Sequence, residues 1–250
     1  MNKQIIFLIF ALSTLISNAA KKDMPKVLCP LKPDPPVVVD GSISEWFTLP
    51  GGTEVSDKDI KHGKKKWKGE DDLSGNFKLC WDKNYLYFMA EVIDDKFRYE
   101  NVGKSLFNND YIMLDIDPHW KPGVKGKFTN KQFLIALGAG NMENSGDPLF
   151  DVLPEFYIYH PAKLKKKANI DVASQKTEDG YVIEARIPWT FLGVKAVQGM
   201  TIGLDLHLSD SDESNSQETM SYLYPHPSGR ILLKHRDKLV PIKLGDTSGK

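Results

Sequence analysis

Residues 76–92 read NFKLCWDKNYLYFMAEV, and no other part of the chain indicates its secondary structure as clearly. Apolar and polar side chains alternate up to Trp81, residues 82–84 form a short polar turn, and the alternation resumes as far as Val92. A period of two is typical of a strand that is buried on one face. Two such strands around a three-residue turn predict an antiparallel β-hairpin.

Shorter segments of the same kind follow one another along the chain. We expect strands at residues 37–39, 111–117, 132–137, 151–159, 170–174, 181–188, 202–209, 220–224 and 239–244. Residues 57–75 are charged and irregular and predict a loop, whereas residues 189–192 predict one helical turn. Because a 3.6-residue period is nowhere sustained over ten residues, the sequence predicts an all-β fold. We expect an antiparallel β-sandwich whose interior is shared by Trp46, Trp81 and Trp189.

The N-terminus has the pattern of a cleavable signal peptide at residues 1–20. An apolar run at 5–16 is followed by the small residues of the segment 17–20, and a run of that length is too short to span ~30 Å of hydrocarbon. An N-terminal membrane anchor is the alternative. We expect a secreted protein, periplasmic or extracellular, with no membrane span, a proline-rich extended lead-in at 21–36 and one sandwich domain at 37–246.

The charge balance excludes whole classes of partner. Lys+Arg and Asp+Glu number 33 each, so no overall electrostatic attraction to nucleic acid or to anionic lipid is expected. The lysine-rich runs at 64–68 and 163–167 are read as solvated loops.

Cys29 and Cys80 are the two cysteines of the chain. In an exported protein they predict a disulfide that ties the lead-in to the hairpin, with two buried thiols as the alternative.

Motifs of familiar catalytic sites are absent from the sequence. It contains no Gly-x-Ser-x-Gly, His-Glu-x-x-His or Cys-x-x-Cys motif and no phosphate-binding glycine loop. Carboxylates are abundant, and they alone keep a hydrolase open as a hypothesis. Asp210 and Asp212 lie in a polar turn, and calcium prefers such oxygen ligands. They are therefore candidate ligands of a structural calcium assembled from separate loops, with solvated turns as the alternative; no other cofactor is expected.

Two groups of aromatic and polar residues are candidates for binding sugar. Flat rings stack on the C–H face of a pyranose, and neighbouring amides or charges bind its hydroxyl groups. Phe107 and Asn109 have this composition in a loop before a strand, and Tyr222, Tyr224 and Arg230 have it near the last turn.

Several motifs together resemble family 9 carbohydrate-binding modules and their DOMON-like relatives. They are VDGSISEW at 39–46, DLS at 72–74, LCWDKNYLY at 79–87, FNNDYIMLDID at 107–117, GYVIEARIPW at 180–189 and the segment 202–210. These motifs keep the family's order from about Val37 to Leu244. The resemblance implies an antiparallel β-sandwich that binds carbohydrate without catalysis, accompanies a glycoside hydrolase and holds structural calcium.

The resemblance covers the scaffold better than the sugar-binding residues. Phe107 stands in place of the first of two tryptophans that clamp a sugar in family members. Met113 stands where the family has an acid, and Leu134 where it has an arginine. The resemblance therefore predicts the fold of this chain better than it predicts the ligand.

Two further functions are alternatives to carbohydrate binding. DOMON-like sandwiches also bind haem, which needs axial ligands such as Met113 and His207, so a haem-binding electron-transfer domain is one alternative. A surface structural module that has lost the sugar pocket is the other.

Overall fold

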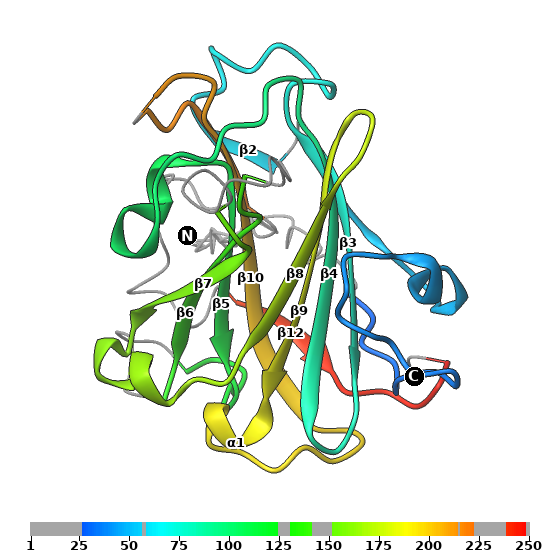
Figure 1. Cartoon of the computed structure of the whole chain (residues 1–250). Coiled ribbons are helices and arrows are strands. Elements are labelled where there is room, and N and C mark those ends of the chain that lie inside the picture. Colours follow the sequence, from blue (N-terminus) through cyan, green and yellow to red (C-terminus); the bar gives the residue numbers. More distant parts are fainter. Residues whose placement is uncertain are drawn as a thin grey trace, which may run out of the picture.

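The protein is a sandwich of two antiparallel β-sheets (Figure 1). The computed structural model describes residues 27–56, 59–124, 131–141, 152–214, 216–222 and 239–248, without the side chains of residues 61, 165–167, 220 and 222. The predicted signal peptide at 1–20 lies outside the described residues. No helix among the described residues is long and apolar enough to cross a bilayer.

The first sheet has the strand order β1-β3-β4-β9-β8. Its strands are β1 (Thr53–Val55), β3 (Ser74–Trp81), β4 (Tyr85–Ile93), β8 (Asp171–Lys176) and β9 (Gly180–Pro188). The second sheet has the order β2-β11-β10-β5-β6-β7, and β12 pairs with the first half of β10. Its strands are β2 (Ile60–His62), β5 (Tyr111–Asp117), β6 (Phe133–Gly138), β7 (Glu155–His160), β10 (Thr201–Asp210), β11 (Thr219–Tyr222) and β12 (Val240–Lys243).

The predicted hairpin is the pair β3–β4. Phe77 faces Ala90, and Leu79 faces Phe88 across the ladder. These side chains point between the sheets and join the main core with the inward residues of β5, β6, β9 and β10. The remaining strand predictions from 111–117 onward coincide with observed strands to within a few residues, and α1 (Trp189–Leu192) is the predicted helical turn.

Trp46 does not share the interior with Trp81 and Trp189, which corrects that expectation. Trp46 belongs to η1 (Ser44–Thr48) and packs with Cys80, Tyr87 and other side chains on the outer face of the first sheet. Its indole Nε1 donates to the carboxylate Oε1 of Glu184 at 2.6 Å. A buried indole N–H needs a hydrogen-bond partner, and the outward residue of β9 provides one.

The disulfide prediction is also wrong in this structure, where both cysteines are free and buried. Cys80 alternates with Leu79 and Trp81, so its side chain belongs to the outer cluster around Trp46. Cys29 packs in the main core instead. The two thiols belong to different hydrophobic clusters and are not bonded, although burial, followed by the charge of nearby Cys80, raises the pKa of Cys29. The alternative reading, two buried thiols, holds.

Two expectations near the N-terminus need correction. Residues 37–39 form no strand: Val37 is buried against the cluster around Trp46, while Val38 is half exposed. The predicted loop at 57–75 contains the short strand β2, and β1 precedes it. The part of the lead-in that the structure describes is docked on the domain, because Leu31 pairs with Trp81 and Cys29 with Leu244.

Candidate functional site

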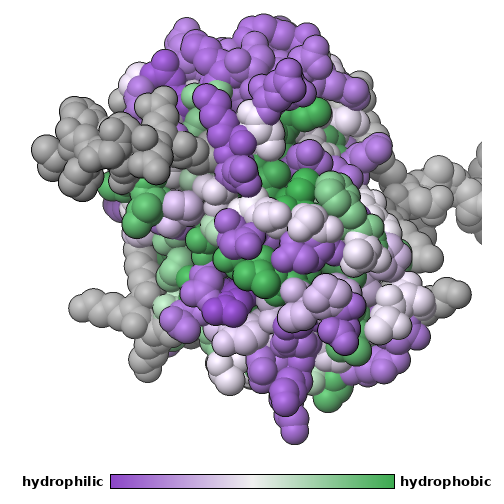
Figure 2. All heavy atoms as spheres, turned by 45° about the vertical axis from the view of Figure 1, so that its right-hand side comes forward, coloured by the Kyte–Doolittle hydropathy of each residue, from purple (hydrophilic) through white to green (hydrophobic). Residues whose placement is uncertain are grey.

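Six aspartates gather at the end of the sandwich opposite α1, where β4 and β10 end and β5 begins. Three of them, Asp94, Asp110 and Asp210, are all buried, and we call them the inner aspartates. One oxygen of each lies within 4.8 Å of an oxygen of the other two. Figure 2 shows that hydrophilic side chains gather over this upper end of the molecule.

Backbone and hydroxyl donors fix the inner aspartates. Asp110 accepts from the N–H groups of Arg98 and Ser211, the latter at 2.7 Å. Asp210 Oδ2 accepts from Thr219 Oγ1 at 2.8 Å, and Asp94 Oδ1 accepts from the Lys96 N–H at 2.9 Å. Asp94 Oδ2 and Asp210 Oδ1 have no hydrogen-bond partner among the described residues. Two buried acceptors are thus left for a cation or a proton.

The electrostatics of this trio favour a positive partner. Burial, followed by the effect of neighbouring carboxylates, raises the pKa of Asp210 to about 7 and that of Asp94 to about 6. Burial and the charge of Asp94 also raise the pKa of Asp110 well above its usual range. Mutual repulsion of this kind is relieved by protonation or by a cation among the carboxylates.

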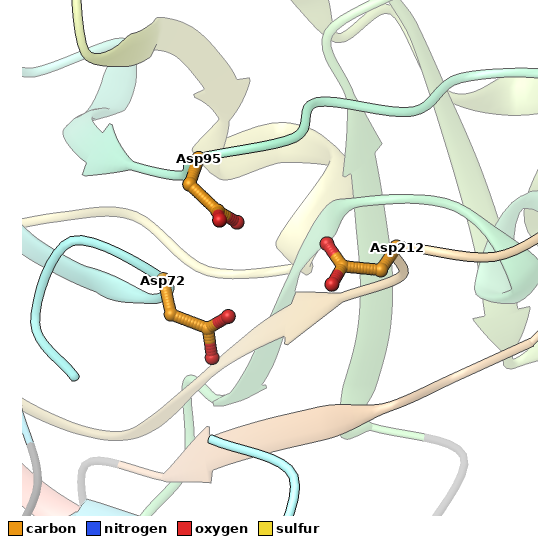
Figure 3. A group of neighbouring side chains, drawn as sticks. All are labelled: Asp72, Asp95 and Asp212. Atoms are coloured by element: carbon orange, nitrogen blue, oxygen red, sulfur yellow. The ribbon is translucent and has the colours of Figure 1, made fainter. Parts of the chain in front are cut away.

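A second trio lies beside the first. Asp72, Asp95 and Asp212, the outer aspartates, point toward one another from three separate loops (Figure 3). In this trio a side chain of the protein, Lys68, supplies a positive charge. Lys68 Nζ donates to Asp212 Oδ2 at 2.6 Å and to Asp72 Oδ1 at 3.0 Å. The predicted metal ligands Asp210 and Asp212 therefore belong to different trios.

An aromatic surface is built by β7 and η3 (Gly103–Asn108). Phe107 is 43% exposed and meets Tyr159 edge to face, with ring centroids 6.4 Å apart. Tyr159 in turn meets Tyr157 at 4.7 Å. Because residues two apart on a strand share a face, both tyrosines stand on the outer side of the second sheet. We call Phe107, Tyr157 and Tyr159 the aromatic platform.

Hydrogen bonds from β7 hold η3 in place. Glu155 Oε1 accepts from the N–H of Gly103 at 3.0 Å and from the Tyr99 hydroxyl at 3.1 Å. Gly103 has φ +59°, a conformation that favours glycine, where η3 begins. The hydroxyl of Tyr159 donates to the carbonyl of Lys104 at 2.9 Å. Phe107 is thereby positioned by a strand and not by its loop alone.

The other predicted sugar-binding residues are placed as follows. Asn109 is fully buried, and its amide is bonded to the backbone of Glu100 and Asn101, so it holds the loop beside Phe107 and does not reach the surface. Tyr222 ends β11, but its side chain lies outside the described part of the molecule, as do Tyr224 and Arg230 entirely.

The two departures from the family pattern lie side by side. Met113 and Leu134 are both buried and pack with Leu106, Tyr111 and Ala136 in an apolar cluster, against which Tyr157 and Tyr159 also pack. The floor beside the platform is therefore apolar where the resemblance implies an acid and an arginine.

Met113 and His207 are direct cross-strand partners on β5 and β10. Their side chains project from the same face, about 5 Å apart at Cβ. Axial haem ligands must stand on opposite sides of the macrocycle, and two parallel neighbours leave no gap for one between them. The geometry gives the haem hypothesis no support.

A family model described as "Carbohydrate family 9 binding domain-like" matches residues 39–226. This chain belongs to that family. Family 9 carbohydrate-binding domains are non-catalytic, and the chain is accordingly a binding module and not an enzyme. The match confirms the resemblance drawn from the motifs and the predicted sandwich.

The relatives and neighbours agree with this assignment. The chain is 24% identical to exoglucanase XynX of Acetivibrio thermocellus over 161 residues, and 25% identical to endo-1,4-beta-xylanase C of Paenibacillus barcinonensis over 164 residues. These matches span 64% and 66% of this chain but only 13% of each enzyme.

A family 9 carbohydrate-binding module from Caldicellulosiruptor kristjanssonii, solved with cellotriose, has the same fold. The TM-score is 0.63 at 18% identity, over 88% of this chain and 94% of that one. A family 9 carbohydrate-binding module from the same organism, solved with glucose, gives a TM-score of 0.61 at 18% identity, over 87% of this chain and 95% of that one.

Sequence reasoning missed the tyrosines of the platform and most of the aspartates. Tyr157 and Tyr159 flank Ile158 with the period of a strand, a signal that places both rings on one face. The aspartates lie where strands begin or end, but only the three-dimensional structure brings the ends of β4 and β10 close to the start of β5.

Proposed function

We propose that this family 9 domain binds oligosaccharides of β-1,4-linked glucose or xylose on the aromatic platform. The observation that carries the proposal is the contact between half-exposed Phe107 and Tyr159, held by hydrogen bonds from β7. The known neighbour bound to cellotriose and the xylanase relatives suggest these sugars.

The chemistry of the platform suits a pyranose. Phe107 offers a hydrophobic face for the axial C–H groups, and stacking of this kind needs no ion pair. Tyr222, Tyr224 and Arg230 remain proposed partners for the sugar hydroxyls. Because Met113 and Leu134 have replaced the acid and the arginine, we expect hydrophobic stacking to contribute a larger share of the affinity than in family members that keep both.

Calorimetric titration with cellotriose and xylotriose tests the proposal. Phe107→Ala should weaken binding at least tenfold, the loss of about 1.4 kcal/mol expected for a central aromatic contact. Phe47→Ala is the matched control, because Phe47 is 73% exposed on η1, which lies on the other sheet. If Phe107→Ala and Phe47→Ala bound the sugars with equal affinity, the sugar would not bind on the aromatic platform.

The apolar floor favours a second candidate, a surface structural module. Met113 and Leu134 are fully packed and offer no polar atom to a ligand. If no glycan in a panel of β-glucans, xylans and host oligosaccharides binds the unmodified protein, this candidate replaces the first.

We also propose that the inner aspartates hold a structural calcium ion. Three buried carboxylates from different parts of the chain, two with an oxygen that lacks a described partner, match the oxygen ligands that calcium takes. Asp94, Asp110 and Asp210 would hold the ion, which would link β4, β5 and β10. Equilibrium dialysis with calcium tests this assignment.

The setting of the domain is a further proposal. Its relatives are large glycoside hydrolases of which it spans about 13%. We propose that it acts outside the cytoplasm beside such an enzyme, after cleavage of residues 1–20. Mass spectrometry of the exported protein should find a mature chain that begins near residue 21.

A further inference from the structure

The outer aspartates differ from the inner ones in one respect: a side chain of the protein already supplies a positive charge. Lys68 Nζ lies between Asp72 and Asp212, at 3.0 Å and 2.6 Å from their carboxylate oxygens. The backbone N–H of Lys68 also donates to Asp72 Oδ2, at 2.9 Å. Asp72 thus directs both of its oxygens at the same residue.

The outer trio otherwise has the features of a cation site. Asp72, Asp95 and Asp212 each offer an oxygen within 4.8 Å of the other two, and their side chains converge in Figure 3. Asp212 is 8% exposed, and its Oδ1 has no hydrogen-bond partner among the described residues. A buried carboxylate oxygen without a partner indicates room for one more positive group or donor.

The charges decide what each trio can accept. No lysine or arginine side chain of the described residues contacts the inner aspartates, so three carboxylates face one another there unopposed. In the outer trio Lys68 neutralises one of three charges and occupies oxygens that a metal would need. An ammonium group donates to carboxylates but, unlike calcium, cannot gather six to eight oxygens.

We infer that Lys68 is a built-in cation that replaces a second calcium ion and limits the domain to the single inner site. This inference rests on the proposed inner calcium site, but it assigns a separate role to a residue that takes no part in that site. Lys68 determines how many divalent ions the end of the sandwich can hold.

The test compares the calcium stoichiometry of the full chain with that of Lys68→Met, which keeps the length of the side chain and removes its charge. Decalcified protein is dialysed against calcium. We expect one bound ion for the unmodified protein and two for K68M. The double variant K68M/D212N should return to one ion, because it removes a buried carboxylate of the new site.

Lys66→Met is the matched control for loss of one positive charge. Lys66 lies in the same loop, and its ammonium group is paired with Glu218 at 3.6 Å, not with an outer aspartate. We expect K66M to bind one ion, like the unmodified protein. Circular dichroism checks that each variant keeps its sheet content, and Lys68, which is 59% exposed, is not needed for the core.

The outcomes separate the two proposals. One ion in both the unmodified protein and K68M, or two in both, would overturn the role of Lys68 while leaving the inner site intact. No ion in the unmodified protein and one in K68M would overturn the inner site and support the role of Lys68. No ion in either would overturn both.

Discussion

At the scale of single residues, Glu184 shows how a buried charge can fix a segment of irregular structure. Its side chain is fully buried on the outer face of β9. Oε2 accepts from the N–H groups of Gly41 at 2.7 Å and Asp40 at 3.1 Å, while Oε1 accepts from Trp46. One carboxylate thus holds the turn at 40–41 and the helix η1 against the first sheet.

Glu184→Gln should destabilise the protein by roughly 1–3 kcal/mol, because the amide offers one acceptor oxygen and turns an NH₂ group toward donors. Thermal unfolding should show a lower Tm. Glu91→Gln is the control, since Glu91 is exposed on β4 of the same sheet. A similar Tm for both variants would mean that the three donors find other partners, and sugar affinity should change in neither.

At the scale of elements, β7 determines where η3 and its phenylalanine stand. Tyr159→Phe keeps a ring in the platform and removes the hydrogen bond to the Lys104 carbonyl. We expect a loss of about 1 kcal/mol in sugar binding, or about fivefold in Kd, since η3 is held less firmly. Tyr85→Phe removes a hydroxyl from β4 in the other sheet and should leave Kd unchanged. A larger effect of Tyr85 than of Tyr159 in the calorimeter would contradict this role for β7.

The elements also show how far sequence can predict this molecule. Local patterns are enough to predict the β3–β4 hairpin, β5 and β9. They do not show that β5 and most of β9 are buried on both faces. They fail for residues 37–39, where Val37 and Val39 pack in the cluster of Trp46 without forming a strand. They also fail for β1 and β2, strands of three residues each that lie in polar surroundings.

The candidate sites are formed by residues that are distant in the sequence and come together only in the folded chain. Local sequence patterns do not show which of these residues will meet. Asp210 and Asp212 were predicted as metal ligands from their turn, but their partners Asp72, Asp94, Asp95 and Asp110 come from other strand ends. Cys29 and Cys80 were predicted to pair because two cysteines in an exported protein favour a disulfide. In the structure they are not bonded: the alternation along β3 turns the Cys80 side chain toward the cluster of Trp46, whereas Cys29 packs in the main core.

At the scale of the whole molecule, the aspartate cluster makes folding sensitive to pH. The pKa of Asp94 is raised to about 6 and that of Asp210 to about 7, and burial raises the pKa of Asp115 in the same direction. A folded state with raised carboxyl pKa values binds more protons than the unfolded chain between pH 4 and pH 7. The free energy of unfolding therefore falls as pH rises through this range when no metal is bound.

Calcium should reverse this trend, because it binds the deprotonated carboxylates of the folded state and not the unfolded chain. In a chelator, we expect Tm to decrease from pH 5 to pH 7.5. At pH 5, Tm in excess calcium should be almost the same as in chelator, whereas at pH 7.5 it should be clearly higher. The difference in Tm between the two conditions should therefore grow through pH 6–7. Magnesium should open a smaller gap, since it demands a stricter geometry and keeps its water.

Asp210→Asn assigns the effect to the inner aspartates. The amide is neutral at every pH, so the variant should lose most of the calcium-dependent gap and should show a shallower decrease of Tm in chelator. The decrease does not vanish, because Asp94, Asp110 and Asp115 still titrate with raised pKa values. If Tm in chelator instead rose between pH 5 and pH 7.5, the carboxylates would be stabilised as anions by the fold itself, and the end of the sandwich would need no metal.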